Sequence, residues 1–228
     1  PIQRVMDHMN NGSGILALWN DCTAGSEDLY ERWYHGEHLS DRVSIEGFRL
    51  GRRHEAVDAR SRFFTYYETD SPEVLFSPAY FHQLDNPSPL TRRIMNGVFI
   101  NATRSVCTRV QQIGVERGGF VVAIRSPSIE TETLLAGSLD TLWKQPGVVR
   151  IELWRRATVG PEFTGHDPRQ EEQIRGPDEQ IGSCLVIHAT RLKEAESIVR
   201  YLREPGHQGL DIGLYRFLCE LRHEECQA

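Results

Sequence analysis

The chain has 228 residues, of which 39% are hydrophobic and 25% are charged, as in an ordinary globular protein. Its formal charge of −6 comes from 32 acidic and 26 basic residues that are interspersed along the sequence, which argues against a nucleic-acid or anionic-lipid partner. The longest apolar runs have the length of strands and fall short of a membrane-spanning helix, so no membrane partner is expected.

In the first half of the chain, the hydrophobic pattern predicts the order βαββαβ after a loose tail over residues 1–13. A helix over 26–43 begins at Ser26, where Glu27 and Asp28 suit the helix dipole. Gly47 marks the turn that follows it. The other predicted elements are a strand before this helix (14–22), strands at 48–56, 62–69 and 98–110, and a helix over 72–84.

The second half, which begins after Gly118-Gly119, repeats this order of elements. Its strands are predicted at 120–126, 148–157, 182–190 and 212–223, and its helices at 128–145 and 192–204. Gly47 and Gly147 lie 100 residues apart at the same helix-to-strand turn, so they fix the register between the halves. The polar segment 157–180 has no hydrophobic period and is predicted to be a lid or a disordered loop.

Each half is therefore predicted to be a ferredoxin-like repeat, the first over 14–112 and the second over 118–224. Two helices cover one face of such a four-stranded antiparallel sheet and leave the other face bare. Two copies in one chain can bury these bare faces against each other. The predicted fold class is α+β, with two βαββαβ repeats packed sheet to sheet as a pseudo-dimeric α+β barrel.

The run WYHGEHL, residues 33–39, is the strongest candidate for a site. At about 100° per residue, Glu37 lies about 40° from Trp33, inside the apolar arc of the helix, and His38 lies on the flank beside Tyr34. A glutamate in that position must be paired, hydrogen-bonded or protonated through a raised pKa, and these conditions also suit a general acid or base. We predict Glu37 and His38 as a catalytic pair. The alternative is a hydrogen-bonded edge of a structural helix.

Other polar and aromatic side chains are candidates for substrate binding. Asp21 ends the first strand just before this helix and is predicted to reach the same pocket or to serve as a turn. Arg52, beside Arg49 and Arg53, is predicted to bind a substrate carboxylate or to face solvent. The complete set predicted to bind substrate is Trp33, Tyr34, Asp21, Arg52, Tyr66 and His82, of which Tyr66 (or Tyr67) and His82 would complete a proton-transfer set.

No metal site is predicted, because His35 and His38 do not converge with Glu37 on one face and no HExxH motif occurs. His188, in the middle of a strand, is predicted to be a satisfied core or pocket histidine. The five cysteines are an odd number with no CxxC pair, which favours reduced thiols. Together with an amino-terminal stretch that lacks an apolar signal core, they predict a cytoplasmic protein.

The run LYERWYHGEHLSDRVSIEGFRLGRR resembles the pattern F-x-x-W-Y-x-x-E-H-[IL]…G-F…R-R of EthD-like proteins in the dimeric α+β barrel superfamily. The matching positions are Trp33, Tyr34, Glu37, His38, Leu39, Gly47, Phe48, Arg52 and Arg53. The resemblance covers most of residues 14–110, and the second half resembles the same fold loosely. It implies a pocket between sheet and helices, with Glu37 and His38 at its rim.

The superfamily includes isomerases, decarboxylases, polyketide cyclases, cofactor-free monooxygenases and haem enzymes, so the resemblance does not fix the chemistry. We predict an enzyme of isomerase, lyase or decarboxylase type that needs no cofactor. Its substrate would be a small, aromatic or conjugated organic acid, lactone or ketone. The alternatives are a non-catalytic small-molecule-binding or stress-associated protein, and a cofactor-free monooxygenase or haem-binding protein. A homodimer is possible.

Overall fold

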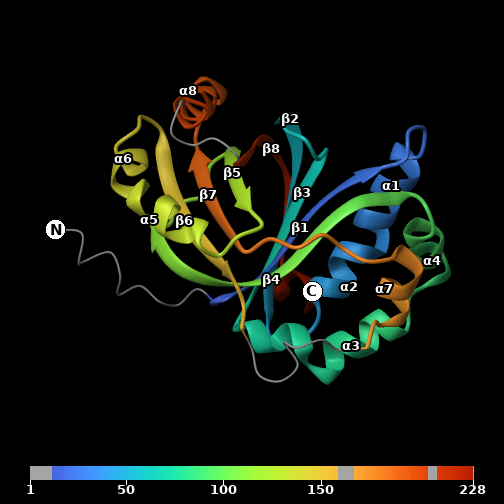
Figure 1. Cartoon of the computed structure of the whole chain (residues 1–228). Helices are drawn as coiled ribbons and strands as arrows, with labels where there is room; N and C mark the ends of the chain where they lie inside the picture. The colour runs from blue at the N-terminus through green and yellow to red at the C-terminus, as the bar shows by residue number, and fades with distance from the viewer. Residues whose placement is uncertain (1–11, 159–166, 205–209, 228) are drawn as a thin grey trace.

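The computed structural model describes residues 12–158, 167–204 and 210–227. Its eight strands form one closed antiparallel barrel in the order β1-β3-β2-β8-β5-β7-β6-β4 (Figure 1). The strands are β1 (Gly14–Cys22), β2 (Phe48–Asp58), β3 (Phe63–Thr69), β4 (Phe99–Ile113), β5 (Phe120–Ser126), β6 (Val148–Arg156), β7 (Ser183–Ala189) and β8 (Asp211–Arg222). The prediction of a mixed α+β fold built on an antiparallel barrel is confirmed. The predicted amino-terminal tail lies, up to residue 11, outside the described residues.

The barrel consists of two arcs with the same internal order, β4-β1-β3-β2 and β8-β5-β7-β6. Two seams join the arcs, one where β2 pairs with β8 and one where β4 pairs with β6. Gly47 and Gly147 stand at the turns that lead into β2 and β6, with φ of 89° and 76°. Glycine is favoured there because other residues rarely adopt positive φ. At both seams, the edge strand of one arc pairs directly with the edge strand of the other.

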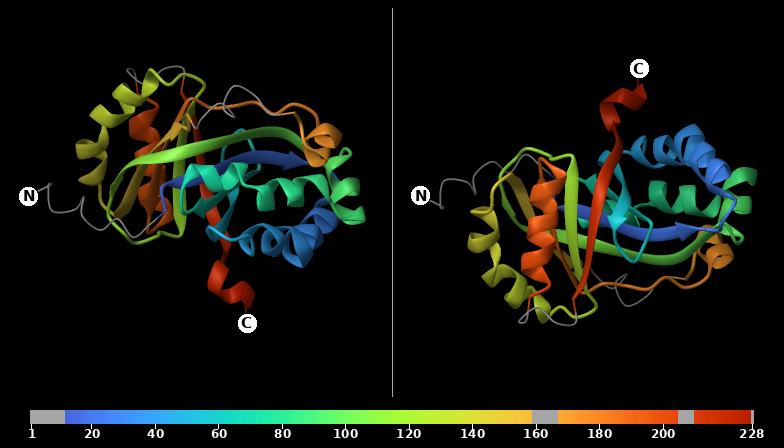
Figure 2. Two further views of the ribbon diagram at one scale, coloured as in Figure 1. Left: turned by 90° about the horizontal axis from the view of Figure 1, so that it is seen from below. Right: turned by 90° about the horizontal axis from the view of Figure 1, so that it is seen from above.

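Helices cover the outside of the barrel on two opposite sides (Figure 2). The first arc carries α1 (Glu27–Trp33), the π-helix η2 (Tyr34–His38), α2 (Leu39–Val43), the 3₁₀ helix η3 (Pro72–Phe76), α3 (Pro78–Asp85) and α4 (Pro89–Met95). The second arc carries α5 (Thr131–Gly137), α6 (Leu139–Trp143) and α8 (Leu192–Leu202). A short 3₁₀ helix, η5 (His223–Gln227), follows β8.

The helix predicted over 72–84 is broken into η3 and α3, and α4 follows it. Ser77 and Ser88 start α3 and α4, because each is followed by a proline and each hydroxyl accepts a hydrogen bond from a backbone N–H three residues on. A backbone N–H at the first position of a helix has no partner within the helix, so proline, which has no N–H, is well tolerated there. Both Ser-Pro pairs therefore favour the start of a new helix.

The alternation of side chains along the strands separates two kinds of core. Outward-facing residues pack beneath the helices in two clusters, one for each arc. Inward-facing residues fill the barrel, where Trp19 stacks on Phe64 with ring centroids 4.7 Å apart. The barrel interior is therefore packed with side chains.

The segment predicted as a lid or disordered loop, 157–180, contains the helix α7 (Gln170–Arg175). This helix belongs in sequence to the second half, yet it packs against α3 and α4 of the first arc (Figure 1). Beyond it, Glu179 pairs with Thr103 in an isolated parallel bridge. Disorder is therefore the wrong prediction for residues 167–180, while residues 159–166 lie outside the described part of the chain.

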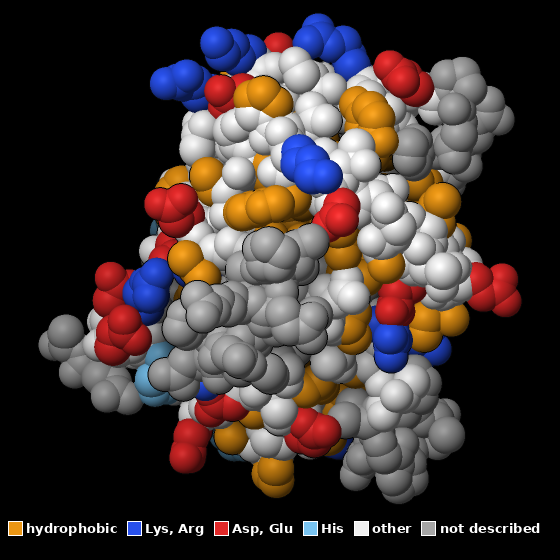
Figure 3. Space-filling model, turned by 90° about the vertical axis from the view of Figure 1, so that its left-hand side faces the viewer, with side chains coloured by type: hydrophobic (Ala, Val, Ile, Leu, Met, Phe, Trp, Pro, Cys, Tyr) orange, Lys and Arg blue, Asp and Glu red, His pale blue; other side chains and the backbone are white. Residues whose placement is uncertain are grey.

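The side of the molecule that bears α5 and α6 has a mixed surface. Hydrophobic side chains are spread among charged ones there (Figure 3). Ile129, Leu134 and Trp143 are the exposed large hydrophobic residues of this region. Within the described ranges, no helix combines the length and the apolar character needed to cross a membrane.

Candidate functional site

A π-helical turn shapes the WYHGEHL segment. Residues Tyr34–His38 form the π-helix η2 between α1 and α2. The wider turn brings Trp33 and His38, five residues apart, to the same face, and their ring centroids lie 4.0 Å apart. His38 is consequently buried, whereas Glu37 is half-buried at the helix edge. The expectation from a regular helix, with Glu37 in the apolar arc and His38 on the flank, is wrong for this reason.

The buried His38 imidazole faces a small cavity between the first arc and its helices. The cavity has a volume of about 20 Å³, and its polar lining includes Arg42, Tyr67 and Arg104. Burial, and next the neighbouring Arg42 and Arg53, hold the pKa of His38 well below its ordinary value. Among the described residues, no group hydrogen-bonds to the His38 ring. The site therefore presents a neutral imidazole with an available lone pair.

Glu37 points away from this cavity and toward the start of α4. Its Oε1 accepts hydrogen bonds from Ser88 Oγ at 2.5 Å and Thr91 Oγ1 at 2.9 Å. Thr91 Oγ1 also accepts a bond from Trp33 Nε1 at 2.9 Å. A chain of contacts thus runs from Glu37 through Thr91 to the indole on which His38 stacks. This geometry suits a residue that positions the Trp33 and His38 rings.

Tyr34 lies in a filled aromatic layer. The Arg53 guanidinium sits over its ring at 3.7 Å from the centroid, and the same guanidinium makes two hydrogen bonds of 2.9 Å to Glu31. Burial raises the pKa of Tyr34. Its hydroxyl group takes no partner among the described residues, but it does not line the His38 cavity. Tyr34 and Trp33 therefore form the wall behind His38.

Helix α7 closes the cavity. Glu171 forms a buried ion pair with Arg42, and Glu172 lies 3.6 Å from Arg104. Arg104 also donates a hydrogen bond of 2.9 Å to the Tyr80 hydroxyl. Arg175 lines the same cavity. These closing groups come from the polar segment 157–180, whose sequence has no hydrophobic period and so does not indicate that they lie at a site.

A larger cleft of about 700 Å³ adjoins this cavity. Met95, Phe99 and Arg175 line both spaces, so these three side chains form the partition between them. Asp21 lines the cleft, where its carboxylate accepts bonds from the Arg62 N–H at 2.7 Å and from Asn101 Nδ2 at 2.9 Å. The cleft provides an approach from solvent toward the partition.

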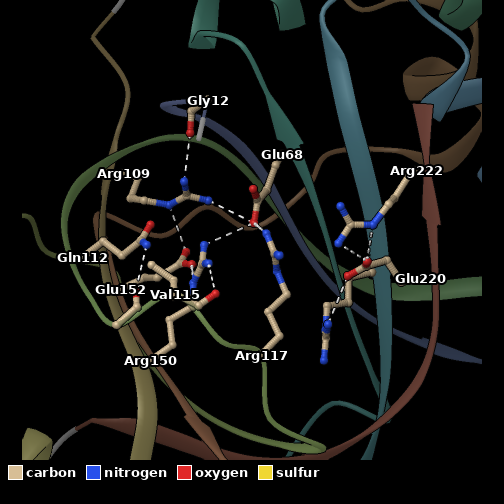
Figure 4. Close-up of polar contacts among 12 residues, drawn as sticks. Gly12, Glu68, Arg109, Gln112, Val115, Arg117, Arg150, Glu152, Glu220 and Arg222 are labelled. Carbon is tan, nitrogen blue, oxygen red and sulfur yellow. Dashed lines mark hydrogen bonds and ion pairs between the residues drawn. The ribbon is translucent and has the colours of Figure 1, made fainter. Parts of the chain in front are cut away.

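The barrel interior holds a separate cluster of charges (Figure 4). Glu68 lies within 3.5 Å of guanidinium nitrogens of Arg109, Arg117 and Arg150. Glu152 pairs with Arg109 at 3.1 Å and with Arg150. Although burial raises the pKa of the Glu152 carboxyl, the two arginines lower it more, so this pKa lies well below its ordinary value. The pairs cross the seam between β4 and β6 and tie the two arcs together.

Arg52 and Tyr66 also point into the barrel. Arg52 donates hydrogen bonds to the Gly118 carbonyl at 2.9 Å and to Glu220 at 3.0 Å. Burial raises the pKa of Tyr66, and its hydroxyl takes no partner among the described residues. Both side chains lie on the face of the sheet opposite His38. His188 is also inside the barrel and both of its ring nitrogens lack partners among the described residues, so the prediction of a satisfied histidine is wrong.

His82 lies exposed on α3, where its ring contacts Asn86. Of the residues predicted for the site, the structure brings Trp33, Tyr34, Glu37 and His38 into one layer. It places Asp21 in the adjoining cleft, Arg52 and Tyr66 in the barrel, and His82 at the surface. The residues that line the cavity through polar or charged side chains and that the sequence did not single out are Arg42, Tyr80, Arg104, Glu171 and Arg175.

No protein-family model matches the chain, and no curated protein matches it. Solved structures do resemble it. An anthrone oxidase-like protein aligns over 96% of both chains with a TM-score of 0.62 and 10% identity. A candidate monooxygenase of Fusobacterium nucleatum aligns over 92% of this chain and 95% of its own, with a TM-score of 0.51 and 10% identity. At this identity the likeness establishes the dimeric α+β barrel fold and leaves the activity open.

Proposed function

We propose that this protein is a cofactor-independent enzyme of isomerase or lyase type that acts on a small aromatic or conjugated organic acid, lactone or ketone. The observation that carries the proposal is the buried, neutral His38 imidazole, which has no hydrogen-bond partner among the described residues and faces a cavity. A neutral imidazole is a competent general base. His38 is the proposed base, and Glu37 positions it through Thr91 and Trp33.

In the proposed step, a ring nitrogen of His38 takes a proton from a carbon next to a carbonyl, and the electron pair of that C–H bond moves into the carbonyl to form an enolate. Arg104, which lines the cavity, is the group proposed to stabilise the enolate oxygen. Return of the proton from His38 to another carbon completes an isomerisation. Aromatic walls keep water from the step.

A second candidate is a cofactor-free oxygenase, in which the same carbanion reacts with O₂ instead of taking its proton back. The names of the two similar structures, an oxidase-like protein and a candidate monooxygenase, favour it. With α7 docked, the space at His38 is about 20 Å³ and is closed by ion pairs, so it admits neither haem nor an aromatic substrate until α7 moves.

We also infer that the two halves are tandem ferredoxin-like copies, 14–112 and 118–224, and that the first derives from an EthD-like ancestor. The identical strand order of the two arcs and the paired glycine turns support this inference. At the 100-residue offset, Thr133, Gly137 and Ser138 replace Trp33, Glu37 and His38. The chain would then have one functional site and one supporting half.

Deuterium exchange tests the proposed proton abstraction. Phenylpyruvate, 1-tetralone and anthrone would be incubated with the protein in D₂O, and deuterium uptake at carbon followed by mass spectrometry. We expect uptake above the buffer rate for at least one probe, and a loss of at least 100-fold in His38→Gln. Glu37→Gln should retain uptake within fivefold. Equal rates in His38→Gln and the unaltered protein would contradict the role of His38, and binding without uptake would favour a non-catalytic binding protein.

An oxygen electrode separates the two chemistries. Consumption of O₂ in step with loss of the probe would identify the oxygenase. Deuterium uptake without O₂ consumption would identify the isomerase or lyase.

A further inference from the structure

The charges around the His38 cavity come from two different sources. The first arc contributes the cations Arg42, from α2, and Arg104, from β4. The carboxylates that pair with them, Glu171 and Glu172, both come from α7, which also contributes Arg175, a cation that lines the cavity and lies 3.7 Å from Glu171. Without α7, the cavity would therefore hold two guanidinium groups beside a neutral imidazole, and neither would keep its ion-pair partner.

We propose that Arg42 is a binding site for the carboxylate group of a flat aromatic or conjugated monocarboxylate, and that the Glu171 carboxylate of α7 occupies this site until the ligand displaces it. The inference rests on the proposed function in placing the ligand beside His38. It narrows the substrate class from acids, lactones and ketones to acids.

The burial of the Arg42–Glu171 pair supports this assignment. Each side chain is only 4% exposed, and Arg42 Nη2 contacts Glu171 Oε2. A guanidinium buried to this degree requires an anionic partner, because an unpaired buried charge is strongly unfavourable. A carboxylate that enters in place of Glu171 supplies the same partner to Arg42. Arginine binds carboxylates well because its planar group can donate two parallel hydrogen bonds.

The walls of the cavity suit a flat apolar body. Tyr80 lies between the two cations, with Arg42 6.0 Å from its ring centroid and Arg104 bonded to its hydroxyl. Phe99 and Leu84 are among the apolar side chains that line the rest of the surface. A ligand whose carboxylate rests on Arg42 would therefore place its body among aromatic and aliphatic side chains and near the His38 ring.

The cavity cannot admit such a ligand while α7 is docked, since a volume of about 20 Å³ holds about one water molecule. Both polar contacts and the apolar side chain of Ile174, which packs against the core of the first arc, hold α7. Arg92 donates to Gln170 at 2.7 Å, and Arg169 lies 3.2 Å from Asp85. Displacement of α7 would exchange one carboxylate for another on Arg42 and would open the partition toward the cleft.

The charge cluster inside the barrel provides a contrast. There, Glu68 and Glu152 are fixed on strands β3 and β6, between partners that also belong to the barrel wall or its adjoining loop. No short peripheral helix supplies those acids. The His38 cavity is the place where one such helix provides both acids.

Calorimetric titration with benzoate, with benzamide as the uncharged probe of the same shape, tests the proposal. In Glu171→Gln, we expect benzoate to bind at least tenfold more tightly than in the unaltered protein, because the internal competitor is weakened. Benzamide affinity should change less than twofold. Glu196→Gln, the same change on the exposed face of α8, should leave both affinities unchanged. Arg42→Met in the Glu171→Gln background should remove the gain.

Hydrogen exchange of the unaltered protein keeps the proposal testable if Glu171→Gln fails to fold. Saturating benzoate should speed exchange of the α7 amides and leave the strand amides unchanged, while benzamide should have no effect. Unchanged α7 exchange at saturation, or equal benzoate affinity in Glu171→Gln and the unaltered protein, would overturn the proposal.

The anion site and the proposed catalysis can fail separately. The anion site is tested by benzoate affinity in Glu171→Gln and Arg42→Met, and the catalysis is tested by deuterium uptake in His38→Gln. If His38→Gln loses deuterium uptake but no benzoate binds at Arg42, the proposed enzyme activity stands. In that case the restriction of the substrate to acids is wrong.

Discussion

The histidine at position 38 combines two properties that normally oppose each other, burial and an unpaired ring. Because burial and nearby arginines lower its pKa, the imidazole stays neutral at pH values where an exposed histidine is charged. We expect the rate of deuterium uptake to stay constant as the pH falls through about 6.5, the ordinary value for histidine. A pH–rate profile would check this. A half-maximal rate near pH 6.5 would indicate a base other than His38.

The glutamate at position 37 should matter for stability more than for the rate. Glu37→Ala removes the acceptor of two hydroxyl hydrogen bonds at the start of α4, so we expect the free energy of unfolding to fall by about 1–3 kcal/mol. Denaturant unfolding would measure this change. Glu31→Ala is the comparison variant. It removes a glutamate of α1 that pairs with Arg53. A 100-fold loss of rate in Glu37→Ala with unchanged stability would assign Glu37 a chemical role.

At the scale of single elements, the π turn between α1 and α2 behaves as a one-residue insertion. Deletion of Gly36 should convert Tyr34–His38 to α-helix and keep Trp33 and His38 on one face, now four residues apart. No atom lies within 4 Å of a Cβ built at this glycine. We expect a folded protein whose melting temperature falls by a few degrees, about 1 kcal/mol. The deletion of Glu196 from α8, a regular helix, is the control.

That control deletion should behave differently, because it rotates every later residue of α8 by about 100° and turns the buried face toward solvent. Circular dichroism melts of both variants would show the difference. If both deletions lower the melting temperature by a similar amount, η2 does not behave as an α-helix with one inserted residue.

The sequence predicted individual elements to different degrees. Strands β1 and β5 have the predicted bounds, because alternating side chains and flanking turns define them locally. The π turn could not be predicted, since a period of 3.6 residues was assumed for the whole helix. Helix α7 was missed because it is short and polar, and ion pairs to Arg42 and Arg104, more than 60 positions earlier, hold it in place.

For the whole molecule, three buried histidines make the fold sensitive to acid. Burial lowers the pKa of His38, His54 and His188, to about 3 for His54. Each is neutral when folded and gains a proton on unfolding below about pH 6.5, so acid favours the unfolded chain. For His54 we expect the free energy of unfolding to fall by about 1.4 kcal/mol per pH unit, starting near pH 6 and continuing toward pH 3, and His38 and His188 should add losses in the same direction.

Urea unfolding at a series of pH values would check this slope. The variant His54→Gln should show a shallower decline than the unaltered protein. A free energy of unfolding that stays flat from pH 7 to pH 5 would contradict the prediction.

A mixed α+β fold built on an antiparallel barrel was predicted from the repeated pattern, whereas the polar interior of the barrel was not. Arg150, Glu152 and Trp154 alternate with Ile151 and Leu153 along β6, and a charged strand face of this kind usually lies toward solvent. Closure of the barrel turns that face inward, and the charges are then buried as pairs. Only the tertiary arrangement decides which partner each charge meets, so the sequence could not locate them.

The closed order of the strands has a further consequence for how the protein behaves among other proteins. Each strand in the described part of the chain has a hydrogen-bonded neighbour on both sides, so these strands offer no free edge along which another chain could add a strand. Misassembly by strand addition, a common route to fibrils, would first require the seam between β2 and β8 or between β4 and β6 to open. Resistance to aggregation should therefore follow the strength of these two seams more closely than the hydrophobicity of any one strand.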